Sequence, residues 1–147
     1  MRIRNILFAT DFSPASRAAF RQALARASDG HATLWIGHVI PAAPLADVRS
    51  AVPRVYREMD DFLRRDAEKR LEVLARTARR AGARTQTLLL RGVPHEAIGQ
   101  AARRCRADLV VLGTHGRTGV SRLVVGSVAS RVIATAPCPV LTVRSPR

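Results

Sequence analysis

The chain has 147 residues, 47% of them hydrophobic, and we expect residues 1–147 to form one globular domain. It has no apolar run near the ~20 residues that cross a bilayer, and its first residues lack the apolar core of a secretory signal. These features argue against membrane and secreted proteins and favour a cytoplasmic one, while the net charge of +14, spread along the chain, leaves anionic partners open.

The hydrophobic pattern predicts strands that alternate with helices. In chain order we expect a strand at 3–9, a helix at 14–28, strand 32–40, helix 55–82, strand 84–90, a helix opened by Gly92-Val93-Pro94, strand 107–112, helix 127–136 and strand 140–143. Such alternation is typical of a parallel sheet that is covered on both faces. The sequence therefore predicts an α/β fold, a doubly wound open sheet of five parallel strands in the order 3-2-1-4-5, with helices on both faces.

Local signals mark several boundaries. Ser13 is a good N-cap and Pro14 fits the first helical position. The segment from Pro41 to Pro53 holds three prolines and little periodicity, so we expect a loop there. Gly82 suits a helix C-cap. The long helix before it carries apolar residues at three-to-four spacing, which are expected to face the core: Val55, Met59, Phe62, Leu63, Ala67, Leu71, Leu74 and Ala78.

A glycine-containing segment follows the fourth expected strand and runs from Gly113 to Ser127. Gly113 and Gly116 let the backbone approach a ligand without an intervening Cβ. Gly126 and Ser127 open the next helix, whose unpaired N–H groups favour an anion. Arg117 and Arg122 add positive charge. The segment is thus a candidate phosphate site, and the alternative is an ordinary glycine-rich turn with a capping serine.

Two blocks of this chain resemble the universal stress protein family. The spacing Gly-x2-Gly-x9-Gly-Ser within Asp108 to Arg144 matches its nucleotide-binding members, and Ile6 to Ser13 is similar to its opening strand and acidic loop. The resemblance implies that Asp11 and the ends of the first two strands border adenine and ribose, and that the glycine segment holds phosphates. The site residues implied, together with Arg117, are Ala9, Thr10, Asp11, Val39, Leu112, Gly113, Gly116, Gly126, Ser127 and Val128.

The resemblance further implies an ATP-binding, cytoplasmic stress-response regulator, with Mg²⁺ accompanying the nucleotide and dimers forming through the strand from Pro139 to Val143. We expect binding without efficient turnover, because Asp11 is the only acid placed near the glycine segment; slow hydrolysis or self-phosphorylation stays open. The charge of +14 supports an alternative hypothesis, a basic module for nucleic acid or an acidic protein. Sparse aromatic residues argue against a platform that stacks single strands.

Other chemistries lack their motifs. The four histidines, among them His38 and His115, have no metal-ligand spacing, and the single lysine, Lys69, is not in a phosphate-binding loop. Cys105 and Cys138 do not form a disulfide framework and are expected to be small buried or half-buried residues.

Overall fold

The computed structural model describes residues 1–114 and 125–145, without the side chains of 43–46. Within these residues, five parallel strands lie in the order β3-β2-β1-β4-β5, as predicted. The strands are β1 (Asn5–Ala9), β2 (Thr33–Pro41), β3 (Arg84–Gly92), β4 (Leu109–Gly113) and β5 (Val140–Val143). The helices are α1 (Pro14–Gly30), α2 (Ala43–Ala51), α3 (Pro53–Arg80), α4 (Pro94–Arg104) and α5 (Ser127–Thr135). The α/β class and the strand order are both confirmed.

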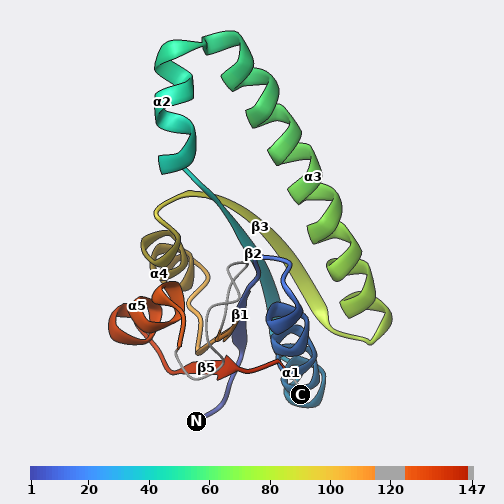
Figure 1. Cartoon of the computed structure of the whole chain (residues 1–147). Coiled ribbons are helices and arrows are strands. Elements are labelled where there is room, and N and C mark those ends of the chain that lie inside the picture. The colour runs from blue at the N-terminus through green and yellow to red at the C-terminus, as the bar shows by residue number, and fades with distance from the viewer. Residues whose placement is uncertain (115–124, 146–147) are drawn as a thin grey trace.

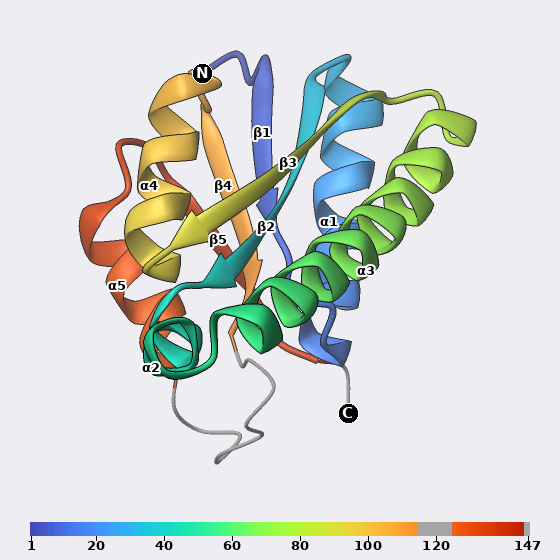
Figure 2. The ribbon, with the colours of Figure 1, turned by 90° about the horizontal axis from the view of Figure 1, so that it is seen from above.

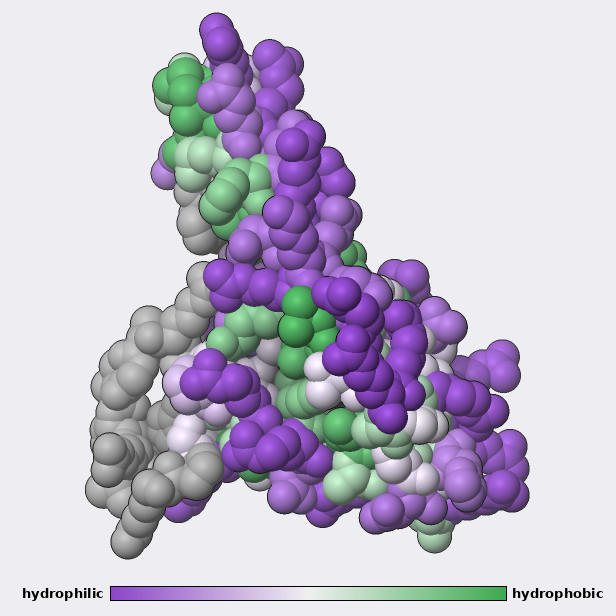
Figure 3. Space-filling model, turned by 90° about the vertical axis from the view of Figure 1, so that its right-hand side faces the viewer, coloured by the Kyte–Doolittle hydropathy of each residue, from purple (hydrophilic) through white to green (hydrophobic). Residues whose placement is uncertain are grey.

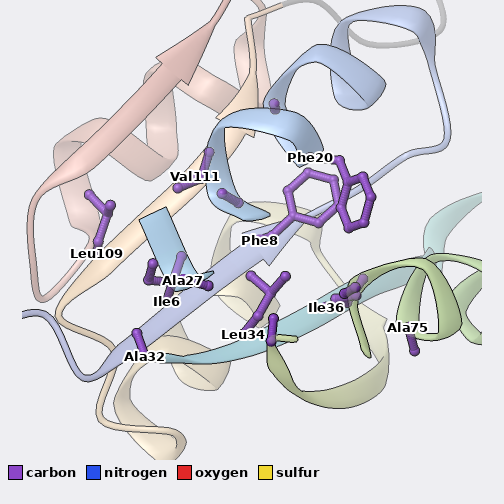
Figure 4. Packing of buried hydrophobic residues seen from close by; sticks show 14 of the residues in the cluster. Ile6, Phe8, Phe20, Ala27, Ala32, Leu34, Ile36, Ala75, Leu109 and Val111 are labelled. Atoms are coloured by element: carbon purple, nitrogen blue, oxygen red, sulfur yellow. The ribbon is translucent and has the colours of Figure 1, made fainter. Parts of the chain in front are cut away.

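Helices cover both faces of the sheet, with α1 and α3 on one side and α4 and α5 on the other (Figures 1 and 2). The central strand β1 is buried from both sides, because Phe8 packs with the α1–α3 side and Leu7 with the α4–α5 side. The ring centroids of Phe8 and Phe20 are 5.5 Å apart in the first of these layers (Figure 4). Burying each such side chain stabilises the fold by about 1.5–3 kcal/mol, so the sheet forms a firm base for the loops at its ends.

Helix α1 starts as the sequence predicts. The Ser13 side chain accepts a hydrogen bond from the Ser16 N–H at 3.2 Å, and Pro14 occupies the first turn. The helix packs on the sheet through a row of fully buried alanines, which includes Ala19, Ala23 and Ala27. These small side chains bring the α1 backbone close to the strands, which matters for the loop that follows β1.

The prediction of a loop between Pro41 and Pro53 is wrong. Strand β2 continues to Pro41, and α2 occupies residues 43–51. Pro44 and Pro53 both lie in the first turn of a helix, α2 and α3 respectively, where a missing N–H breaks no helical hydrogen bond. These prolines therefore mark two helix starts and not an irregular segment.

Only the second half of α3 rests on the sheet. Ala67, Leu71 and Ala78 are buried, as the apolar pattern predicts, but Phe62 near the other end is 68% exposed. Ala75, which the predicted stripe did not include, is buried as well. The first half of α3 extends beyond the strands together with α2, and hydrophobic surface is visible near that end (Figures 1 and 3). The predicted stripe is thus a core face over only part of its length. Among the described residues, no helix is both long and apolar enough to span a bilayer.

Candidate functional site

The carboxyl ends of β1 and β4 lie side by side at the centre of the sheet. Ala9 pairs in register with Leu112 on one side and with Gly37 on the other, and the Thr10 N–H donates to the Gly37 carbonyl at 2.8 Å. The chain first adds β2 and β3 on one side and then β4 and β5 on the other, so the strand order reverses between β1 and β4. Ligands of open α/β sheets bind in the crevice at such a reversal. The fold therefore brings Ala9, Thr10, Leu112 and Gly113 to one place.

Side chains fix the loop that leaves β1. The hydroxyl oxygens of Thr10 and Ser16 are 2.6 Å apart and buried, and the Thr10 oxygen also accepts from the Phe12 N–H at 3.0 Å. These bonds join the end of β1 to the first turn of α1. The loop is therefore held in one conformation at the carboxyl edge of the sheet.

One carboxylate oxygen of Asp11 forms a hydrogen bond within the fold. Its Oδ1 accepts a hydrogen bond from the Ser13 N–H at 3.0 Å in a local Asx turn, while Ser13 itself caps α1. Within residues 1–114 and 125–145, Oδ2 accepts no hydrogen bond, and the side chain is half-buried. The arrangement leaves a carboxylate oxygen at the carboxyl edge of the sheet that can accept hydrogen bonds from hydroxyl groups.

An aromatic stack stands beside this loop. Phe12 adopts a left-handed backbone conformation with φ of 63°, and its ring centroid is 4.5 Å from that of His38 on β2. The Arg70 guanidinium of α3 lies 5.4 Å from the Phe12 centroid. Because the Thr10 carbonyl only accepts, the His38 Nδ1 at 2.8 Å must be the donor, which fixes the tautomer.

Sequence reasoning did not find Phe12 and Arg70 as neighbours of the site. Phe12 reads as an ordinary apolar residue, and Arg70 is one of many arginines on a helix 58 residues further along the chain. The predicted site residue Val39 follows His38 on β2 and is half-buried among the side chains of the α4–α5 layer. Its side chain thus belongs to the core, as expected, and only its backbone is a candidate for ligand contact.

Gly113 has a structural role of its own. A Cβ built on Gly113 would lie 2.9 Å from the Ala15 carbonyl carbon and 3.0 Å from the Ser16 nitrogen. Both neighbours belong to the backbone of α1, which can move aside only at a cost in free energy. Glycine at this position therefore permits the close packing of α1 on the end of β4, whatever contact it makes with a ligand.

The two described ends of the glycine segment are tied to each other and to β5. The Gly126 N–H donates to the Thr114 carbonyl at 2.7 Å, and the Thr114 N–H donates to the Val143 carbonyl at 2.9 Å. Two of the predicted phosphate contacts, Gly116 and Arg117, lie outside the described residues. These hydrogen bonds therefore fix both ends of the glycine segment beside the carboxyl end of β4.

Helix α5 begins at this junction. Gly126 is its N-cap and Ser127 its first residue, and the Ser127 side chain is exposed. Val128 is 37% exposed and Ala129 is buried. The N–H groups of the first helical turn have no partner in the helix itself, so the start of α5 presents donors and the positive end of the helix dipole next to β4. These are groups that can hold phosphate.

One ion pair braces the same edge of the sheet. Asp60 of α3 and Arg91 at the end of β3 form two hydrogen bonds, and this contact lowers the pKa of the Asp60 carboxyl and raises that of Arg91. The pair joins the projecting half of α3 to the sheet. No group of three or more potential metal ligands occurs among the described residues.

The two cysteines lie away from this edge. Both are free thiols, Cys105 buried and Cys138 half-buried, as the sequence suggests. Burial raises the pKa of each thiol, which keeps both in the less reactive protonated form. Neither residue takes part in the crevice.

Comparison with known proteins gives consistent matches over the whole chain. The model of the universal stress protein family matches residues 2–144. Universal stress protein MJ0531 of Methanocaldococcus jannaschii is 32% identical over 98% of this chain and 84% of its own. A universal stress protein of Thermus aquaticus is 38% identical over 96% of this chain and 98% of its own.

Solved structures agree in fold. Universal stress protein UspA from Lactobacillus plantarum superposes with a TM-score of 0.89 at 30% identity, covering 98% of this chain and 99% of that one. The universal stress protein from Archaeoglobus fulgidus in complex with dAMP gives a TM-score of 0.68 at 25% identity, covering 97% and 99% of the two chains.

Proposed function

The chain belongs to the universal stress protein family, and from this premise we propose that it is a single nucleotide-binding domain that takes ATP at the carboxyl edge of its sheet. In the cell it would act as a cytoplasmic stress-response regulator. The nucleotide in the relative from Archaeoglobus fulgidus, dAMP, supports an adenine nucleotide as the class of ligand. The observation that carries the proposal is the reversal of strand order at β1 and β4: the loop with Asp11 follows β1, and the Gly126 N–H at the start of α5 bonds to Thr114 directly after β4.

Each part of the proposed site at the carboxyl edge suits a different part of an adenine nucleotide. The unpaired Oδ2 of Asp11 suits the two hydroxyl groups of a ribose, because a carboxylate oxygen accepts hydrogen bonds from both. The N–H groups and dipole at the start of α5 suit phosphate, and the exposed Ser127 hydroxyl can donate to a phosphate oxygen. Gly116 and Arg117 complete the proposed phosphate cradle.

Regulation by occupancy fits the site better than rapid catalysis. Among the described residues near the crevice, Asp11 and His38 are the groups that can exchange a proton, and His38 donates its Nδ1 proton to a backbone carbonyl. We therefore propose that Mg²⁺, where it accompanies ATP, is held through the phosphates, and that turnover is slow. Rapid multiple-turnover hydrolysis that is lost on Gly116→Val would contradict this part of the proposal.

Calorimetric titration of the nucleotide-free protein with ATP, Mg·ATP and AMP tests the site. Asp11→Asn keeps an oxygen for the Ser13 N–H but removes the charge, and Ser127→Ala removes the hydroxyl. A hydrogen bond to a charged group contributes about 1.5–3 kcal/mol, so each variant should weaken ATP binding by about tenfold or more.

Two variants serve as matched controls. Asp29→Asn changes the net charge as Asp11→Asn does, at an exposed position of α1, and Thr135→Ala removes a hydroxyl from the far end of α5. Both should bind ATP as the wild type does. If the wild type binds no adenine nucleotide, or if the controls lose affinity as strongly as the site variants, the proposal fails.

We also propose a homodimer through the strand from Pro139 to Val143. Strand β5 pairs only with β4 in the described sheet, so its outer edge is available to a second copy. The carbonyls of Pro139 and Val143 accept from β4 and from Thr114, so by alternation the Thr142 N–H and carbonyl point away from β4. Thr142 is therefore positioned to pair with a partner strand.

Light scattering during size-exclusion chromatography tests the dimer. Thr142→Pro removes the outward N–H without touching the bonds to β4, and should give monomers. Thr142→Val keeps the N–H and the shape and should stay dimeric. A monomeric wild type, or a Thr142→Pro variant that dimerises as strongly as the wild type, would show that this edge is not the interface.

A further inference from the structure

Positive and negative charges are distributed unevenly over the fold. Six of the 11 acidic residues lie on α3, and the ion pairs of residues 1–114 and 125–145 all include a residue of α3. Beside the amino ends of the strands the sequence places only Asp29 and Asp108. The Asp108 Oδ2 already accepts from the Arg4 N–H at 2.8 Å and the Asn5 N–H at 2.9 Å. Acids are therefore few at this edge of the sheet, and Asp108 is the one that interacts electrostatically with Arg4.

Exposed arginines occupy the same edge. Arg84 is the first residue of β3, Arg4 precedes β1, and Arg106 lies in the turn before β4. None of the three makes an ion pair in the described chain. Arginines at helix C-termini commonly offset the helix dipole, and Arg106, which directly follows the C-cap of α4, is placed to do so. Arg4 and Arg84 stand at strand starts, so a helix dipole does not explain their presence.

The backbone places these three arginines in a row across the sheet. Parallel strands are spaced by about 4.8 Å, so the step from β3 past β2 and β1 to β4 covers about 15 Å. The row is firmly held, because the Arg4 carbonyl accepts from the Thr33 N–H at 2.8 Å and Arg84 Nη2 donates to the His31 carbonyl at 2.7 Å.

A hollow lies beside one end of the row. Its volume is about 320 Å³, and its lining includes Arg84, His31 and Gly82. The N-terminus lies at this edge, whereas α2 and the start of α3 lie at the opposite one (Figure 2). The basic row is therefore distant from the crevice at the carboxyl edge.

We propose that the row of Arg4, Arg84 and Arg106 binds the phosphate backbone of double-stranded nucleic acid, as a second surface separate from the candidate nucleotide site. Guanidinium groups bind phosphate through paired hydrogen bonds, and a row of about 15 Å spans about four phosphates at 3.4 Å of helix axis each. The contacts are to the backbone and so are independent of base sequence.

Two other anionic partners fit this edge less well. Single strands require exposed aromatic rings for stacking, and Phe62, the exposed aromatic residue of the described chain, lies on the projecting half of α3. Membrane surfaces are bound by an amphipathic helix that lies along the lipid, whereas this edge consists of strand starts and helix ends. The geometry therefore favours a duplex.

Fluorescence anisotropy with short labelled DNA and RNA duplexes, over a series of salt concentrations, tests the proposal on the full chain. The logarithm of the affinity should fall linearly with the logarithm of the salt concentration. The triple variant Arg4→Gln/Arg84→Gln/Arg106→Gln should weaken binding by about tenfold or more and reduce the salt slope by about two to three. Its ATP titration should match that of the wild type, and its thermal unfolding should shift by no more than the loss of the exposed hydrogen bond from Arg84 to the His31 carbonyl.

A second triple variant separates this surface from net charge. Arg57→Gln/Arg65→Gln/Arg76→Gln removes the same charge from exposed arginines of α3 that make no ion pair in the described chain. It should change duplex affinity by less than about twofold. The proposal is overturned if the wild type binds no duplex, if both triple variants lose affinity equally, or if anionic phosphatidylglycerol vesicles are bound more tightly than the duplex and lost with the first triple variant.

Discussion

Two aspartates at opposite ends of the sheet, Asp108 and Asp11, both accept hydrogen bonds from the main chain, and only Asp11 belongs to the proposed site. Asp108, at the amino edge, uses one oxygen to accept two backbone N–H groups, which ties the start of β1 to β4. Asp11, at the carboxyl edge, accepts one backbone N–H through Oδ1, while Oδ2 accepts none in the described chain. Each carboxylate therefore keeps one oxygen without a hydrogen bond in the described chain, and what distinguishes Asp11 is its position after β1, where the strand order reverses.

The loops around the two aspartates also differ in which groups hold their backbone. At the amino edge Oδ2 of Asp108 accepts two main-chain N–H groups while Oδ1 accepts none in the described chain, and the Arg4 and Asn5 N–H groups lower the pKa of the carboxyl. At the carboxyl edge the hydroxyl groups of Thr10, Ser13 and Ser16 hold the backbone of the loop that carries Asp11. Polar groups thus stabilise the backbone at both edges, and the carboxyl edge is the one where we propose a ligand.

The largest effect is expected where the carboxyl edge itself depends on packing. Gly113→Ala places a Cβ against the α1 backbone, and overpacking of this kind costs about 1–3 kcal/mol of unfolding free energy. Gly99→Ala in α4 is the control, because its Cβ meets only the end of the Arg103 side chain at 3.6 Å. It should be neutral or stabilising by about 0.5–1 kcal/mol. Urea unfolding of both variants decides whether Gly113 serves the fold as well as the site.

The two aspartates should separate stability from binding. Asp108→Asn removes the charge from two charge-assisted hydrogen bonds and should lower the unfolding free energy by about 1 kcal/mol, with ATP affinity unchanged. Asp11→Asn should instead cause a large loss of ATP affinity and a smaller loss of unfolding free energy. Chemical unfolding and calorimetry on the same samples measure both. A loss of affinity in Asp108→Asn would break the distinction.

The contribution of Asp108 to the unfolding free energy should depend on pH in the acid range. Its pKa in the folded chain is lowered from the ordinary value of 3.8, so the unfolded chain takes up the proton first as the pH falls. The stabilisation is therefore complete well above pH 3.8 and is lost as the pH falls through the lowered pKa. The difference in unfolding free energy between wild type and Asp108→Asn should be constant near neutrality and shrink below about pH 4. A difference that stays flat into strong acid would contradict this origin.

The smallest effect is expected for the brace between Asp60 and Arg91. The Arg91 side chain is 45% exposed, and pairs this accessible contribute about 0–1 kcal/mol, so Arg91→Gln should change the unfolding free energy by less than about 1 kcal/mol. Glu58→Gln, in the more exposed pair with Arg54, should have no measurable effect. Hydrogen exchange in the first half of α3 gives a more sensitive measure, and Arg91→Gln should speed it there.

Much of the fold could be predicted because the signals are local. Alternating apolar strands and helices set the parallel sheet, and Ser13-Pro14 set the start of α1. The segment 41–53 could not be read in the same way, since proline is common both in loops and in the first turn of a helix. Only the neighbouring helical turns in the structure decide between these two roles, as α2 and α3 show.

By itself the sequence determined which residues form strands, the family, and the positions of Asp11 and of the glycine segment along the chain. The tertiary structure decided what each of these touches. It gave Gly113 a packing role against α1, brought Phe12, His38 and Arg70 into one stack, and left half of the α3 stripe in solvent. The physical reason is that periodicity and caps depend on neighbours along the chain, whereas close approach, stacking and burial depend on segments that only folding brings together.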